Sequence, residues 1–183
     1  MKKLSLATLL SVFASGGAFA ASGGGTINFT GTINNDACTV DNANNDKSFA
    51  VDLGNVSIKD LQTNVEAGRR TPVDFKFDIH CSPGTAVKIQ FDASSGSGSH
   101  APSGALKLIP GTDAATGVAI AVLRDNGSVI DLNSSAGGAI KTDLSEAGST
   151  TMGFSAGYVL TSTAEAAKPG RADATLPFIL EYE

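Results

Sequence analysis

Residues 26–33 form a strand-like segment in which polar and apolar side chains alternate without interruption. Such alternation is typical of a β-strand with one buried face. Glycines occupy positions 23–25, so the segment follows a flexible connection near the start of the chain. A strand in this position can complete a sheet other than its own, and this possibility restricts the fold more than any other feature. The residues on its apolar face are Ile27, Phe29, Gly31 and Ile33.

The first twenty residues are typical of a secretory signal peptide. Two lysines precede an apolar run at residues 4–13, and the small residues that follow predict cleavage between Ala20 and Ala21. The apolar run is too short to span a bilayer. The expected organisation is therefore a signal peptide at 1–20, an N-terminal extension at 21–34 and one domain at 35–183.

The charge and the cysteines restrict the possible partners. The sequence carries a formal net charge of −5 at pH 7, and loss of Lys2 and Lys3 with the signal makes the exported chain more acidic. This acidity argues against nucleic acids and anionic lipids as partners. Cys38 and Cys81 are the chain's two cysteines, and export makes a single disulfide between them the default. The alternative is two free thiols or half of a metal site, which the missing further ligands disfavour.

Two alternating runs, residues 73–81 and 87–91, flank a Ser-Pro-Gly turn. We expect these runs to be neighbouring strands of one antiparallel sheet. Cys81 lies on the apolar face of its run, so a disulfide to Cys38 is expected to join two layers of the fold.

The rest of the chain also reads as short strands separated by turns. Residues 118–123 are almost all apolar, as in a strand covered on both faces. Asp125-Asn126-Gly127 is a hairpin turn signal before a returning strand at 129–132. These short strands predict an all-β, immunoglobulin-like sandwich. Further strands are expected at 49–53, 105–109 and 152–160, about a turn of helix within 56–64, and an exposed loop at 94–104.

The chain ends within a last alternating run, with Phe178, Leu180 and Tyr182 on one face. Pro177 cannot donate to a strand ladder, which suits an edge strand or the start of a paired segment. An apolar edge strand promotes aggregation unless something covers it. We therefore expect an incomplete sandwich that lacks its last strand and has a hydrophobic groove beside the terminal strand.

The segment at 26–33 fits such a groove. If one copy inserts this segment into the next copy, the contact is β-strand addition. Donor and acceptor surfaces differ, so the contact is head to tail and propagates into a filament unless a ring closes. Burial of Ile27, Phe29 and Ile33 offers about 5–9 kcal/mol at roughly 1.5–3 kcal/mol per side chain.

Taken in order, these segments resemble the subunits of chaperone–usher fimbriae, closest to the major pilins of type 1 fimbriae. The resemblance covers essentially the whole exported chain. Its motifs are the segment at 27–33, Asn-Asp-Ala-Cys-Thr-Val at 35–40, Val-Asp-Leu-Gly-Asn-Val at 51–56, Ile-His-Cys at 79–81, Gly170 fourteenth from the end and Tyr182 in the penultimate position.

The resemblance implies a structural subunit of a bacterial surface fimbria that supports cell adhesion. Its partners would be identical or related subunits, a periplasmic chaperone and an outer-membrane usher, with export through the periplasm to the cell surface. No cofactor is implied. The donor-strand residues would be Ile27, Phe29, Gly31 and Ile33, and the residues that bind the chaperone and then the next donor strand would be Gly170, Phe178, Leu180 and Tyr182.

Other interpretations remain open for several of these features. The segment at 26–33 can be the first strand of its own sandwich, or a lone subunit can fold it into its own groove. Gly170 can be a turn glycine after Pro169. The chain can also be a minor or adaptor subunit, or a monomeric secreted sandwich that binds a ligand. We expect no enzyme and no metal site, because neither His80 nor His100 has carboxylate or thiol partners at a suitable spacing.

Overall fold

The computed structural model describes most of the chain after residue 37. The described residues are 38–41, 49–66, 72–82, 86–134, 139–143 and 148–182. The chain divides into two units, Met1–Asn34 and Asn35–Glu183, and all described residues belong to the second. The predicted signal peptide, its cleavage site and the segment at 26–33 therefore lie outside the described residues.

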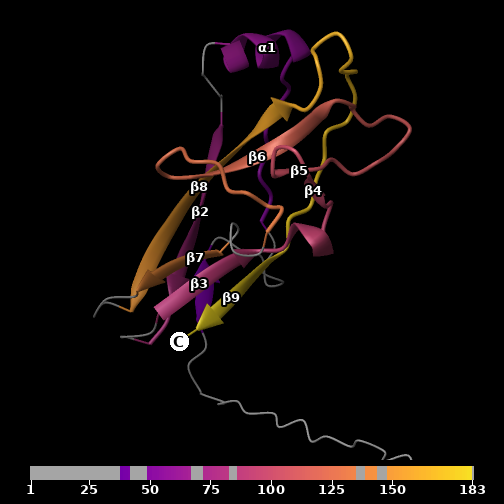
Figure 1. Ribbon diagram of the computed structural model, residues 1–183. Coiled ribbons are helices and arrows are strands. Elements are labelled where there is room, and N and C mark those ends of the chain that lie inside the picture. The colour runs from indigo at the N-terminus through magenta and orange to yellow at the C-terminus, as the bar shows by residue number, and fades with distance from the viewer. Residues whose placement is uncertain are drawn as a thin grey trace, which may run out of the picture. The chain divides into compact units, whose positions relative to one another are not determined.

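Two antiparallel sheets form this second unit (Figure 1). One is six-stranded in the order β1-β2-β8-β6-β5-β4, and the other is three-stranded in the order β7-β3-β9. Their inward side chains share one core, which confirms the β-sandwich predicted from the sequence. The strands are β1 (Thr39–Asp41), β2 (Val73–His80), β3 (Ala86–Phe91), β4 (Ser99–His100), β5 (Ala105–Leu106), β6 (Val118–Arg124), β7 (Ala139–Asp143), β8 (Ser149–Leu160) and β9 (Phe178–Tyr182), and the helices are α1 (Ile58–Glu66) and the 3-10 turn η1 (Ala93–Ser95).

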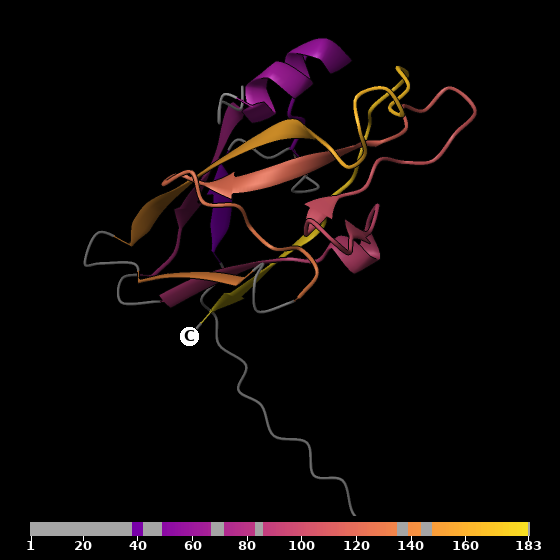
Figure 2. The same cartoon turned by 45° about the horizontal axis from the view of Figure 1, so that its top comes forward.

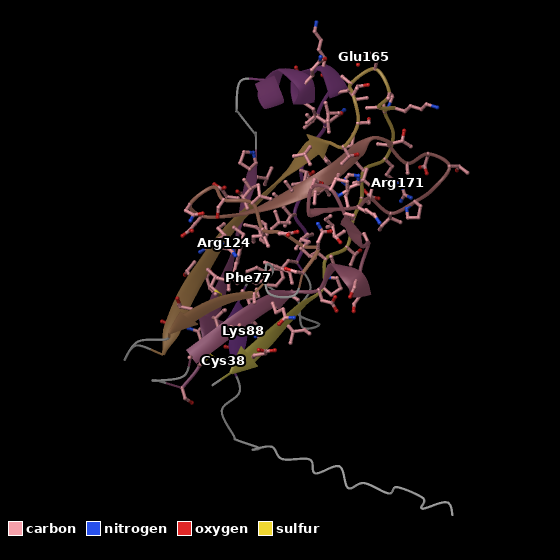
Figure 3. All side chains as sticks on the ribbon, viewed as in Figure 1. Cys38, Phe77, Lys88, Arg124, Glu165 and Arg171 are labelled. Atoms are coloured by element: carbon pink, nitrogen blue, oxygen red, sulfur yellow. A yellow bond between two sulfur atoms is a disulfide. The ribbon has the colours of Figure 1, made fainter. Side chains whose placement is uncertain are left out.

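Alternation along the strands determines which side chains enter the core. Phe77 and Ile79 of β2 are buried, whereas the residues between and beside them are more exposed. Phe77 lies between the two layers (Figure 3), and Figure 2 shows these layers from a second angle. β6 differs because residues 119–123 are all buried. Both of its faces are covered, as its almost continuous apolar sequence predicted.

The runs at 73–81 and 87–91 are not neighbours, so this prediction was wrong. β2 pairs with β1 and β8 in the larger sheet, whereas β3 pairs with β7 and β9 in the smaller one. The chain therefore changes layer between β2 and β3. Alternation specifies the buried face of a strand but carries no information on which strand pairs with it.

The Cys38–Cys81 disulfide is present, as the cysteine content predicted. It does not join two layers, however. Thr39 is paired with His80 across β1 and β2, so the bridge lies one position beyond that pair and links adjacent strands of the same sheet. The disulfide fastens β1 to β2 at the end of their short ladder.

Three local expectations also differ from the structure. The helix expected as about one turn is α1, with nine residues and a buried Leu61. The expected loop at 94–104 contains part of η1 and strand β4, which pairs with β5. The hairpin turn is present, with Gly127 at φ 78°, but the returning chain makes only an isolated bridge between Leu123 and Val129. Among the described helices, none combines the length and apolar character needed to cross a membrane.

Candidate functional site

A groove of about 650 Å³ opens between the two sheets. Strands of both sheets contribute to it, together with two extended segments, 49–53 and 174–177, that belong to neither sheet. Its lining is almost entirely apolar. The lining residues are Phe49, Val51, Leu53, Phe75, Phe77, Phe91, Leu106, Ile120, Val122, Ala156, Ala174, Thr175, Leu176, Pro177, Phe178 and Leu180.

Strand β9 forms one wall of the groove and lies at the edge of the smaller sheet. β3 pairs with one side of β9, and within the described part of the chain no strand pairs with its other side. The backbone N–H and C=O groups of successive strand residues point alternately to the two sides. The Pro177 carbonyl accepts a hydrogen bond from the Asp92 amide at 2.9 Å, so Pro177 and the alternate residues after it face β3. The backbone groups of Leu176, Phe178 and Leu180 consequently face the open side.

This alternation explains how a proline fits beside the groove. β9 begins at Phe178, directly after Pro177, as the sequence predicted for a proline at the start of a paired segment. The ring nitrogen of Pro177, which has no proton to donate, lies on the β3 side. The open side therefore loses no hydrogen-bond donor. The open edge of β9 therefore keeps the hydrogen-bonding groups that an added strand needs.

The segment at 49–53 also lines the groove. Phe49, Val51 and Leu53 face the groove, while Ala50 and Asp52 are exposed. The Phe49 ring lies 4.5 Å from that of Phe77, measured between centroids. The groove lining thus includes the edge strand β9 and the segment at 49–53, over an apolar floor.

The aromatic floor of the groove is centred on Phe77. Its ring meets those of Phe49, Phe75, Phe154 and Phe178 at centroid distances of 4.5, 5.9, 5.6 and 5.0 Å. All four contacts are edge-to-face, the geometry that aromatic pairs favour. The floor is therefore continuous with the core, and a strand that covers the groove also completes the core.

Tyr158 lies near the residues that line the groove. The Tyr158 hydroxyl donates a hydrogen bond to the Ala172 carbonyl at 3.3 Å. Burial raises the pKa of the Tyr158 phenol above its ordinary value, and the nearby charges of Asp173 and Asp52 raise it further. The phenol is neutral at physiological pH and remains a hydrogen-bond donor. Within the described ranges, no group of three or more His, Cys, Asp or Glu side chains could hold a metal ion.

The structure brings together some of the predicted site residues. Phe178 and Leu180 line the groove side by side along β9. Tyr182 is the last residue of β9 and pairs with Val87. The donor residues Ile27, Phe29, Gly31 and Ile33 lie outside the described residues.

Gly170 lies elsewhere. It is not among the groove-lining residues, and its backbone packs against the loop at 113–115. A Cβ atom at Gly170 would lie 2.5 Å from the Asp113 carbonyl oxygen and 2.6 Å from the Ala115 nitrogen. This close approach of two backbones accounts for the glycine without any ligand.

Several groove residues were not predicted as part of a site. The sequence predicted a strand at 49–53, which was wrong because this segment forms no strand, and it did not predict that the segment lines the groove. Alternation from Ala174 through Leu176 to Phe178 also extends the apolar face of β9 backwards across Pro177. That alternation was the sequence signal for a groove edge longer than β9. It was missed because Pro177 marks the start of the paired strand.

Comparison with known proteins agrees with this geometry. Residues 27–183 match the family model described as "Fimbrial protein". The chain belongs to the fimbrial protein family. It is 32% identical over 186 residues to the "Probable major fimbrial subunit LpfA" of Escherichia coli O157:H7, an alignment that covers 100% of this chain and 98% of that protein. The chain is thus a structural subunit of a fimbria, a fibre exposed at the bacterial surface.

Solved structures of fimbrial subunits share the fold. A chain from a chaperone–usher pilus superposes with a TM-score of 0.53 at 23% identity, covering 88% of this chain and 97% of that one. The P pilus rod subunit PapA superposes with a TM-score of 0.56 at 20% identity, covering 80% of this chain and 99% of that one. These similarities support the immunoglobulin-like sandwich of this fimbrial subunit.

Proposed function

We propose that this chain polymerises head to tail by donor-strand exchange, as the major subunit of its fimbria. In this scheme the segment at 27–33 of one copy enters the groove of the next and pairs with the open side of β9. The groove beside β9 is the observation that carries the proposal. The near-complete alignment with a protein described as a probable major subunit supports the assignment as major rather than minor.

The donor segment and the groove wall have matching patterns. The apolar residues 174, 176, 178 and 180 recur at every second position in the groove lining, which also includes Thr175 and Pro177. The apolar face of the donor consists of residues 27, 29, 31 and 33. Both segments have the same length, about 20 Å at roughly 3.3 Å per residue. A donor strand that spans 27–33 therefore covers the whole wall from Ala174 to Leu180.

Two terms stabilise the joined subunits. Burial of the donor's Ile27, Phe29 and Ile33 contributes roughly 1.5–3 kcal/mol per side chain. Each ladder hydrogen bond to the open side of β9 adds about 0.5–1.5 kcal/mol. Burial of the acceptor's aromatic floor makes a further favourable contribution. The contact is therefore long-lived, as a surface fibre requires.

The same groove explains a need for assembly partners. Before polymerisation the subunit exposes an apolar slot and an unpaired strand edge, a combination that promotes aggregation. A periplasmic chaperone that lends its own strand would cover both, and an outer-membrane usher would then catalyse exchange for the next subunit's donor segment. The route runs through the periplasm to the cell surface, where the fibre supports adhesion.

A matched pair of substitutions in the donor segment tests this proposal. Gly31→Leu places a large side chain on the inserted face, whereas Thr32→Leu places the same side chain on the opposite face. We expect Gly31→Leu to block or strongly slow fibre growth and Thr32→Leu to leave it near the wild-type rate. Electron microscopy of fibres assembled by each variant measures this. Equal fibre growth from both variants would contradict insertion of this face.

A further inference from the structure

The segment that leads into β9, residues 172–177, is positioned by a turn on its other side. This turn, residues 92–98, follows β3 and contains η1. Figure 1 shows it at the end of β3, beside the yellow segment that continues into β9. Residues 174–177 line the groove but belong to neither sheet, so the 92–98 turn supplies the contacts that a neighbouring strand supplies elsewhere.

Three hydrogen bonds connect the 92–98 turn to this segment. The Asp92 amide donates to the Pro177 carbonyl at 2.9 Å, and the Ser97 amide donates to the Thr175 carbonyl at 2.9 Å. The Thr175 amide donates in return to the Ser97 hydroxyl at 2.8 Å. Because Thr175 and Pro177 direct their backbone groups at the turn, Ala174 and Leu176 direct theirs at the groove. The turn thus fixes the orientation of the groove edge ahead of β9.

The 92–98 turn is itself held by local hydrogen bonds. The Asp92 carboxylate accepts from the amides of Ser94 and Ser95 at 3.1 and 3.3 Å and from both of their hydroxyls. The amides of Gly96 and Gly98 both donate to the Ala93 carbonyl, at 3.1 and 2.8 Å. Ala93 is buried, with 3% of its surface exposed. A turn with these internal bonds has little freedom to shift.

Gly96 lies where the 92–98 turn meets the groove wall. A Cβ atom there would lie 2.5 Å from Cδ of Pro177 and closer still to the Thr175 carbonyl oxygen. Gly96 has φ −117° and ψ −133°, and these close contacts show that the space beside it also requires glycine. A side chain at this position must push Thr175 and Pro177 away from the turn, and the groove lies on the side to which they would move.

We propose that the 92–98 turn is a brace that sets the groove edge for entry of a donor strand, with Gly96 as its positioning residue. This inference rests on the donor-strand exchange proposed above. The brace holds the backbone groups of Ala174 and Leu176 toward the groove before any partner arrives, so that the ladder can extend beyond β9 without rearrangement. A displaced edge narrows the groove and slows entry.

The test measures association of the full exported chain with a fluorescent peptide that copies residues 25–34. Gly96→Ala is compared with Gly153→Ala, because a Cβ at Gly153 meets only the Asp125 side chain at an ordinary 3.7 Å. We expect Gly96→Ala to slow association about tenfold and Gly153→Ala to leave the rate unchanged. Stopped-flow anisotropy at a temperature well below each variant's melting point gives the rates.

A second pair keeps the inference testable if Gly96→Ala fails to fold. Ser97→Ala removes the hydroxyl that accepts from the Thr175 amide, whereas Ser97→Thr keeps a hydroxyl there. We expect peptide dissociation to be about threefold faster in Ser97→Ala and to return to the wild-type rate in Ser97→Thr. Equal rates in the wild type and all variants would overturn the brace but leave donor-strand exchange standing. Failure of the peptide to bind even to a wild-type chain that lacks its own residues 21–33 would overturn both.

Discussion

At the scale of single residues, Phe77 has the largest part in joining core and groove. Its side chain is 2% exposed and contacts four other phenylalanine rings. Phe77→Ala removes these contacts and leaves a cavity, so we expect a loss of about 3–5 kcal/mol in the free energy of unfolding. Urea unfolding of the subunit with a bound donor peptide measures the loss.

The exposed Ile179 provides the control for Phe77. It lies on the outer face of β9 with 51% of its surface exposed. We expect Ile179→Ala to change the free energy of unfolding by less than about 0.5 kcal/mol. Similar losses in the two variants would show that Phe77 is not the centre of the core.

Asp92 makes the stability of the brace depend on pH. Hydrogen bonds from the side chains of Ser94 and Ser95 lower the pKa of its carboxyl group below the ordinary value. A lowered folded-state pKa stabilises the fold at pH values above the unfolded pKa of about 3.9, and this stabilisation is lost as the pH falls through the folded-state pKa. Asp92→Asn should therefore be less stable than the wild type at neutral pH, with a difference that shrinks in acid.

Unfolding of both proteins at neutral pH and at a series of values below about 4 measures this difference. A gap between wild type and Asp92→Asn that stays constant down to the lowest pH would contradict the role of the ionised carboxylate.

At the scale of elements, the open side of β9 is the feature that function requires. The Leu180 amide faces that side, because the residues on either side of Leu180 face β3. Leu180→Pro removes both the side chain and the amide proton, whereas Leu180→Ala removes only most of the side chain. We expect the proline variant to bind a donor peptide at least about threefold more weakly than the alanine variant, since it also loses a ladder hydrogen bond.

Equilibrium titration with the labelled peptide gives both affinities. Amide hydrogen exchange at Ile179 and Glu181 provides the control, because the ladder between β3 and β9 should persist in both variants. Equal affinities would mean that the donor strand does not pair with this side of β9.

The elements also show what the sequence could predict. Alternation identified the buried faces of β2, β3 and β8 and the terminal edge strand, because a period of two follows directly from strand geometry. It placed β2 beside β3 incorrectly, since pairing depends on contacts between residues far apart in the chain. The segment at 49–53 was wrongly predicted as a strand, and its place in the groove lining follows only from the packing of the two sheets. The 92–98 turn was hidden in a Ser- and Gly-rich stretch that carries no periodic signal.

At the scale of the whole molecule, the described fold is a sandwich with a place for one more strand. A subunit without residues 21–33 should still accept a donor strand but have none to give. If such a subunit is mixed with intact ones, each join to it ends a fibre, because head-to-tail growth needs both surfaces. We expect fibre length to fall as the truncated fraction rises, which electron microscopy measures.

A truncated subunit that also carries Leu180→Pro provides the control. It cannot donate a strand and it accepts one more weakly, so it should shorten fibres less than the truncated subunit without this substitution. Full-length fibres in the presence of a large excess of the truncated subunit without Leu180→Pro would contradict this form of growth.

The most direct test of the missing strand is thermal unfolding of the subunit without residues 1–33, with and without a synthetic copy of residues 25–34. A saturating peptide that fills the groove should raise the melting temperature by about 10 °C, whereas a scrambled peptide should not change it. An unchanged melting temperature with the native peptide would mean that the sandwich has no place for that strand.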